Sequence, residues 1–125
     1  MSEKKKVLYV CTASHTKRVF APGKYEEMCE LFDVTENNGD TNWGSEEVAE
    51  RAEGMYAIVT GWGAPAYTVD DVLGLTNTSY PFVFSLDGLT GNFTWSGACL
   101  AEAFHRSPHG AVGLVAATDV TYWSA

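Results

Sequence analysis

The stretch Val7-Leu8-Tyr9-Val10-Cys11 decides the fold, because it is an uninterrupted apolar run between the lysines at 4–6 and the segment Thr12-Ala13-Ser14. A strand that is apolar on both faces is typical of a parallel sheet covered by helices on both sides. Parallel strands are joined by long crossover connections, which are usually helices. The sequence after this run is therefore expected to alternate between helices and strands.

The rest of the chain shows this alternation. Helical patterns are expected at 22–32, at 45–55 with Ser45 as its cap, from Thr68, and at 98–106. Short apolar runs at 56–60, 82–86 and 111–116 predict strands, and a shorter, more polar strand is expected at 32–35. Right-handed crossovers then predict an α/β, three-layer flavodoxin-like (Rossmann-like) fold. It has five parallel strands in the order 2-1-3-4-5, forms a single domain over residues 1–125, and lacks its last helix.

Composition excludes several classes of partner. The net charge of −8 argues against nucleic acid and anionic membranes, which need clustered lysine and arginine. No apolar run approaches the roughly 20 residues of a membrane span. The basic residues 4–6 lead directly into a strand pattern and not into a signal peptide. Three widely spaced cysteines suit reduced thiols, so a cytoplasmic location is predicted.

The candidate site lies beyond the carboxyl ends of the strands, where open parallel sheets bind ligands. Loops at 12–16, 37–42, 61–64, 87–92 and 118–122 meet there. Their chemistry-bearing residues give the candidate ligand-binding set: Thr12, Ser14, His15, Gly61, Trp62, Gly63, Asp87, Gly88, Thr90 and Asp119. We predict no catalytic residue, no metal site and no cofactor.

Each candidate also has a simpler structural role. The hydroxyls of Thr12 and Ser14 suit a flavin or nucleotide phosphate, but the loop lacks a glycine that would let backbone amides close on it, and a solvated polar loop accounts for them better. Asp87 and Asp119 each follow a strand and are either a carboxylate pair for acid–base chemistry or loop caps.

Two of the cysteines are candidate nucleophiles. Cys11 ends the first strand and His15 follows it, so the two could form a thiol–imidazole pair. A cysteine in a buried strand is more often a small apolar side chain, and Cys99 falls in the apolar stripe of the expected helix 98–106.

Residues 7–73 resemble the flavodoxin-like catalytic domain of D-2-hydroxyacid dehydrogenases. The resemblance rests on the sequences at 31–37, 43–47 and 57–65, with Thr68 and residues 72–73. It implies a partner domain that binds a dinucleotide through G-x-G-x-x-G. This chain contains neither that motif nor that domain.

Residues 61–122 resemble the caspase-like domain of gingipain-type cysteine peptidases. The matching stretches are 80–85, 89–93, 99–104 and 110–118. In that family a Gly-His-Gly loop supplies the catalytic histidine, and a cysteine directly before Leu-Thr-Gly supplies the nucleophile. Here Trp62 and Gly88 stand at those positions.

These observations predict a non-catalytic, designed or chimeric scaffold, joined near residues 61–63, without a dedicated activity. Two alternatives stay open: a cysteine-dependent hydrolase using Cys11 or Cys99 with His15, and a flavin- or nucleotide-binding module at the carboxyl edge of the sheet. A homo-oligomer is also expected. The missing last helix would leave an apolar sheet face for a second copy to cover, with Tyr122 and Trp123 in the contact.

Overall fold

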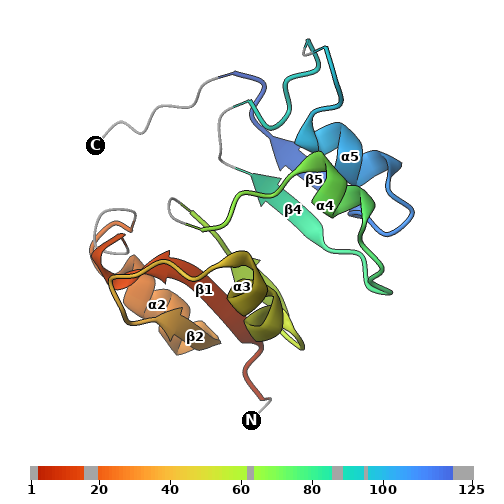
Figure 1. Cartoon of the computed structure of the whole chain (residues 1–125). Helices are drawn as coiled ribbons and strands as arrows, with labels where there is room; N and C mark the ends of the chain where they lie inside the picture. Colours follow the sequence, from red (N-terminus) through yellow and green to blue (C-terminus); the bar gives the residue numbers. More distant parts are fainter. Residues whose placement is uncertain (1–2, 16–19, 62–63, 86–88, 95, 120–125) are drawn as a thin grey trace. The chain divides into compact units, whose positions relative to one another are not determined.

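Figure 1 shows a computed structural model of the chain, which describes residues 3–15, 20–61, 64–85, 89–94 and 96–119. The chain divides into two compact units, Met1–Ala66 and Tyr67–Ala125. The prediction that all 125 residues form one domain stays a prediction. Among the described residues, no helix is both long and apolar enough to cross a membrane.

The first unit contains a parallel three-stranded sheet in the order β2-β1-β3. Its elements are β1 (Lys6–Thr12), α2 (Lys24–Leu31), β2 (Asp33–Asn37), α3 (Ser45–Ala52) and β3 (Ala57–Val59) (Figure 1). β1 is central, and every residue of it after Lys6 is buried. The apolar run at 7–11 is therefore the buried strand that the sequence predicts.

Alternate side chains of β1 pack on different partners. Leu8 and Val10 form a core cluster with Val48 of α3. Tyr9, between them in sequence, meets the ring of Tyr25 of α2 edge to face, with the ring centroids 5.2 Å apart. Successive strand residues point to opposite faces, so the two faces of β1 use different helices.

The second unit contains two parallel strands and two short helices. They are α4 (Val69–Leu73), β4 (Phe82–Ser85), α5 (Leu100–Arg106) and β5 (Gly113–Ala116). β4 and β5 pair in register from Phe82 opposite Gly113 to Ser85 opposite Ala116. A capping box between Thr68 and Asp71 starts α4, as the sequence predicts.

The predicted single five-stranded sheet is not observed, although the order within each sheet agrees with it. The strands form one sheet of three and one of two. Among the described residues, β3 pairs only with β1 and β4 only with β5. β3 is three residues long, so it offers few main-chain groups to specify a second neighbour.

Several apolar side chains of β4 and β5 face solvent. Phe82 and Phe84 are each 64% exposed, and Val115 is 46% exposed. These residues belong to the runs that the sequence predicts as an uncovered apolar face. The oligomer itself stays a prediction, and Tyr122 and Trp123 lie outside the described residues.

Candidate functional site

Three of the predicted site residues lie at the carboxyl end of β1. Thr12 is buried, and its Oγ1 lies 3.2 Å from Ser14 Oγ. Residues 13–15 are helical, and His15 is half-buried. The N–H of Ala13 donates to the carbonyl of Gly39 at 3.3 Å, which ties this segment to the loop after β2. Thr12, Ser14 and His15 therefore lie in one segment at the end of β1, and their role in ligand binding stays a prediction.

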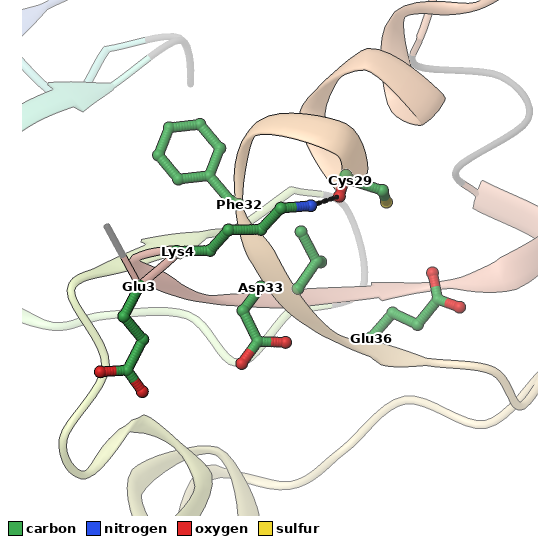
Figure 2. Close-up of a pocket in the computed structure, with 7 residues that line it drawn as sticks. Glu3, Lys4, Cys29, Phe32, Asp33 and Glu36 are labelled. Carbon is green, nitrogen blue, oxygen red and sulfur yellow. Dashed lines mark hydrogen bonds between the residues drawn. The ribbon is translucent and has the colours of Figure 1, made fainter. Parts of the chain in front are cut away.

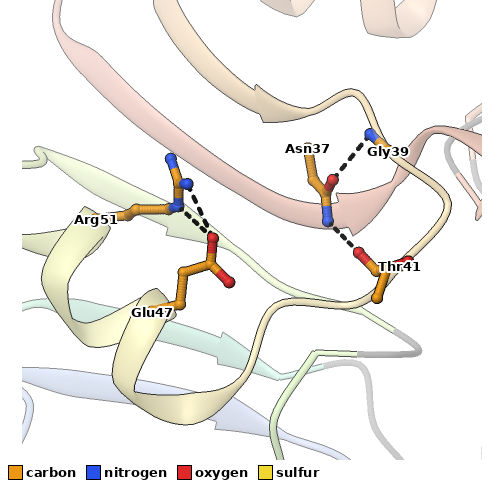
Figure 3. Close-up of polar contacts among 5 residues, drawn as sticks. All are labelled: Asn37, Gly39, Thr41, Glu47 and Arg51. Atoms are coloured by element: carbon orange, nitrogen blue, oxygen red, sulfur yellow. Dashed lines mark hydrogen bonds and ion pairs between the residues drawn. The ribbon is translucent and has the colours of Figure 1, made fainter.

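The loop after β2 is held by one buried side chain. Asn37 Nδ2 donates to the Thr41 carbonyl at 3.0 Å, and the Gly39 N–H donates to Asn37 Oδ1 at 3.0 Å (Figure 3). On α3, Arg51 and Glu47 form an ion pair at 2.9 Å, drawn in the same figure. Because both ends of the Asn37 amide are used by main-chain groups, this side chain has a structural role.

Gly61 packs directly against Cys11. A Cβ built on Gly61 would lie 2.8 Å from Cys11 Sγ, closer than side-chain atoms approach. Burial raises the pKa of the Cys11 thiol and outweighs the opposing hydrogen bond with Tyr9. A protonated, buried thiol is a weak nucleophile. Cys11 is therefore a core residue here, which agrees with the apolar interpretation.

A second group of candidates lies in the second unit, at the carboxyl ends of β4 and β5. Ser85 Oγ lies 3.0 Å from Thr90 Oγ1. The Thr90 carbonyl accepts from Ala101 N–H at 3.0 Å, which joins the loop to α5. The carbonyl of Asp119 accepts from Leu89 N–H at 3.3 Å. Thr90 and Asp119 thus both contribute to the support of the loop after β4.

The same loop holds a strained residue that the sequence does not reveal. Leu89 has φ = 68°, the left-handed region that side chains other than glycine and asparagine rarely adopt. Gly91, two residues on, donates to the Ala117 carbonyl at 2.8 Å, and a Cβ on Gly91 would lie 3.1 Å from Ala116. These contacts hold Leu89 in place. Such strain persists only where neighbouring structure imposes it, and it is common at functional sites.

Cys99 has a different position from the one predicted. Helix α5 begins at Leu100, so Cys99 is its N-cap residue and not part of the helical stripe. Its N–H donates to the Glu102 carboxylate at 3.0 Å, and the residue is buried. The apolar residues that α5 buries are Ala101 and Ala103. Cys99 therefore helps to begin a helix.

The remaining candidates fall on positions that the structure does not cover. Trp62, Gly63, Asp87 and Gly88 lie outside the described residues. In the part of the chain that is described, no group of three histidine, cysteine, aspartate or glutamate side chains could hold a metal ion. The expected absence of a cofactor stays a prediction.

Two open pockets lie in the first unit. One, of about 470 Å³, is lined by Glu3, Lys4, Cys29, Phe32, Asp33, Val34 and Glu36 (Figure 2). In it, Lys4 Nζ donates to the Cys29 carbonyl at 3.3 Å. The other, of about 430 Å³, includes Ala13, Phe20, Tyr25 and Asn37 in its lining. The first pocket lies beside β2 and not at the carboxyl ends of the strands, so it is not among the sites that the sequence predicts.

The fold and these loops define an α/β protein with a fixed, strained loop after a parallel strand. The sequence profile of peptidase family C25 matches residues 43–125, most of the chain, so this chain belongs to peptidase family C25. Gingipain R2 of Porphyromonas gingivalis is 34% identical over 71 residues, which cover 52% of this chain and 10% of the relative. Gingipain R1 of the same organism is 34% identical over 71 residues, covering 52% of this chain and 7% of that protein.

The chain thus spans about a tenth or less of the length of the curated relatives it matches. No solved structure matches it. The family match confirms the resemblance to gingipain-type peptidases. The resemblance of residues 7–73 to D-2-hydroxyacid dehydrogenases gains no support from these matches, and the family match begins at Trp43, inside that stretch.

The predicted function is wrong in its main statement. The match to a peptidase family over residues 43–125 contradicts the prediction of a non-catalytic, designed or chimeric scaffold without a dedicated activity. That match runs through residues 61–63, where the two resemblances predict a joint between two families. A single family accounts for both sides of this position, so a chimeric origin is not needed to explain it.

Proposed function

We propose that this chain is part of a cysteine-dependent peptidase and acts in the hydrolysis of peptide bonds. The family match over residues 43–125 carries this proposal, and the similarity to two gingipains supports it. The chain covers only a small part of those relatives.

The contribution of this chain is the binding and orientation of the peptide beside β4 and β5. The loop at 89–92 supports this role, because it is fastened on two sides by hydrogen bonds to α5 and to the chain after β5. Ser85 and Thr90 bring two hydroxyl groups to the same edge. A rigid support is what a peptide-orienting loop needs, since small displacements of a bound substrate cost large factors in rate.

Turnover by the isolated chain is not expected. By resemblance, the histidine and the nucleophilic cysteine of the family fall at Trp62 and Gly88. Neither side chain accepts a proton from a thiol or attacks a carbonyl. Cys11 does not replace the nucleophile, because burial raises the pKa of its thiol. Cys99 is buried at the start of α5.

The test measures peptide binding and peptide cleavage separately. A panel of fluorogenic peptides is incubated with the chain, and amide chemical shifts are followed by NMR. Binding should shift the amides of Ser85, Thr90 and Asn92 without release of the fluorophore. Thiol-dependent cleavage at enzymatic rates would refute the claim about turnover and leave the peptidase assignment intact.

Two glycine variants provide a matched pair. Gly91→Ala places a methyl group 3.1 Å from Ala116 and should displace the loop, weakening peptide binding. Gly97→Ala adds the same methyl group where no atom lies within 4 Å, and it should leave binding unchanged. Equal affinity of both variants, or shifts confined to residues before 67, would contradict a peptide site at this edge.

The setting and assembly of the chain are further parts of the proposal. All three cysteines are free thiols, which supports a reducing, cytoplasmic setting. The exposed rings of Phe82 and Phe84 support a homo-oligomer through the β4–β5 face. Light scattering at micromolar concentration tests this: Phe84→Ser should lower the mass of an oligomer, and a 13.6 kDa species for the unmodified chain would refute it.

A further inference from the structure

The outer edge of β2 has its main-chain groups directed away from the sheet. The N–H of Asp33 donates to the carbonyl of Lys5 at 3.0 Å, so the main chain of Asp33 is directed toward β1. In a parallel strand the direction of these groups alternates from residue to residue. The N–H and C=O groups of Val34 and Glu36 are therefore directed outward, away from β1. Among the described residues, β2 pairs with β1 alone.

The pocket of about 470 Å³ lies along this edge and not on one face of the sheet. Its lining includes Asp33, on one face of the pleat, and both Val34 and Glu36, on the other. Val34 and Glu36 are the two residues whose main-chain groups are directed outward. The pocket therefore follows the row of main-chain groups that an added strand would use.

The charge of this pocket is negative. The carboxylates of Glu3 and Asp33 line it against the single ammonium group of Lys4 (Figure 2), whereas the Glu36 carboxylate accepts a hydrogen bond from the Tyr25 hydroxyl of α2. Lys4 Nζ donates to the Cys29 carbonyl near the end of α2. The complete chain carries a net charge of −8. An extended segment bound here is therefore favoured if it carries lysine or arginine.

We propose that the outer edge of β2 binds a basic peptide in extended conformation, which adds to the sheet as a further strand. Main-chain hydrogen bonds to Val34 and Glu36 would provide the pairing, and alternate basic side chains, which share one face of the added strand, would lie near Asp33 and Glu3 (Figure 2). This site lies before residue 43, where the family match begins. It is independent of the peptide-binding edge proposed for β4 and β5.

Three other accounts of this acidic edge predict different results: the charges keep other strands away, a second copy of the chain binds there, or the edge attracts any cation. Charged side chains on an edge strand can prevent pairing with another strand, and a guarding role predicts that no peptide pairs with β2. A second copy of this chain is a poor occupant, because two acidic β2 edges would place like charges opposite each other. Simple attraction of any cation predicts binding that does not depend on the peptide main chain.

The experiment uses the complete chain and an acetylated, amidated Lys-Val-Lys-Val-Lys peptide, followed by NMR and calorimetry. Binding should shift the amides of Val34 and Glu36 and weaken as salt is raised, because exposed charges are screened over about 10 Å at 0.1 M. The same peptide with glutamate for lysine should not bind. Two further peptides carry N-methyl groups on one or the other set of alternate amides, with the charge unchanged. One of the two sets faces β2, so one of these peptides should no longer produce the shifts.

Variants of the chain test the two parts of the site. Asp33→Asn and Glu3→Gln should each weaken binding up to about fivefold, the size of a single exposed ion pair. Glu50→Gln removes an exposed carboxylate on α3 outside the pocket and should leave affinity unchanged. Val34→Pro removes one outward N–H while the Asp33 bond to β1 is retained, and it should also weaken binding.

The proposal is overturned if the lysine peptide produces no shifts in β2 at millimolar concentration. Unchanged affinity of both N-methylated peptides would also overturn it, because attraction would then be independent of strand pairing. These results come from the unmodified chain, so they hold even if a variant fails to fold.

Discussion

The contact between Gly61 and Cys11 can be tested by changing its two partners separately and together. A methyl group on Gly61 would lie 2.8 Å from Cys11 Sγ, whereas non-bonded atoms pack best at about 3.5–4.0 Å. The overlap is thus about 1 Å. Cys11 is 2% exposed and lies in the central strand, so its sulfur has little room to move.

The expected free energies follow from this overlap. Overpacking a core typically costs about 1–3 kcal/mol. Gly61 is not in the left-handed region, so replacing glycine returns about 0.4–1 kcal/mol by restricting the unfolded chain. Gly61→Ala should therefore destabilise the protein by about 1–2 kcal/mol. Cys11→Ala alone removes one buried heavy atom and should cost about 1 kcal/mol.

The double variant decides whether the two effects share one cause. With the sulfur absent, the new methyl group occupies the vacated space, so the double variant should be more stable than the sum of the single variants by about 1–2 kcal/mol. Urea unfolding followed by circular dichroism measures the three differences, and hydrogen exchange of the β1 amides locates them. Gly97→Ala serves as the control. Additive effects within about 0.3 kcal/mol would refute the proposed contact.

Four further predictions concern other parts of the chain. Gly110→Ala places a methyl group 1.8 Å from the Phe104 carbonyl oxygen, a clash with a main-chain atom, so thermal melting should show a loss above about 3 kcal/mol; a loss below about 1 kcal/mol contradicts the contact. Thr68→Ala removes the N-cap of α4 and should cost about 1 kcal/mol in urea unfolding, whereas Thr68→Ser should cost much less. Burial raises the pKa of Cys11 above its usual 9.0, so the stabilisation it contributes is complete below pH 9 and is lost as the pH rises; unfolding measured from about pH 8 to 10.5 should show a smaller fall for Cys11→Ala than for the unmodified chain. Leu89→Gly should be more stable than Leu89→Ala by about 1 kcal/mol because φ is 68°, and the reverse order would show that the residue is not strained.

Local patterns predict most of the elements, and the errors at their ends have identifiable causes. The helix expected from Pro22 begins at Lys24, because Gly23 adopts φ = 82° and starts the helix as its N-cap. Helix α3 begins at Ser45, with Gly44 as its N-cap in place of the predicted serine. Glycine at an N-cap provides no side-chain signal, so residue type alone does not locate these helix starts.

The candidate site is less predictable than the fold. Thr12, Ser14 and His15 lie together because they are near neighbours in the sequence after one strand, so their proximity is no test of the predicted ligand site, which stays a prediction. The left-handed Leu89 has no signal in the sequence, since leucine rarely adopts φ = 68° and only hydrogen bonds from distant residues keep it there. The pocket beside β2 could not be predicted from the rule that ligands bind at the carboxyl ends of parallel strands, because it lies along the edge of the sheet.

The error about function comes from taking Trp62 and Gly88, which by resemblance stand at two catalytic positions, as evidence about the whole chain. Trp62 and Gly88 concern one chemical step, whereas the match to peptidase family C25 extends over residues 43–125. Fold-forming residues and catalytic residues are separable, so losing the second group says little about membership of a family. The conformation of Leu89 bears on peptide binding separately from catalysis. A left-handed leucine costs about 1–2 kcal/mol, a cost that glycine at the same position would avoid. Keeping leucine there is understandable if the loop beside β4 still has to hold a peptide, and that requirement is separate from the ability to cleave it.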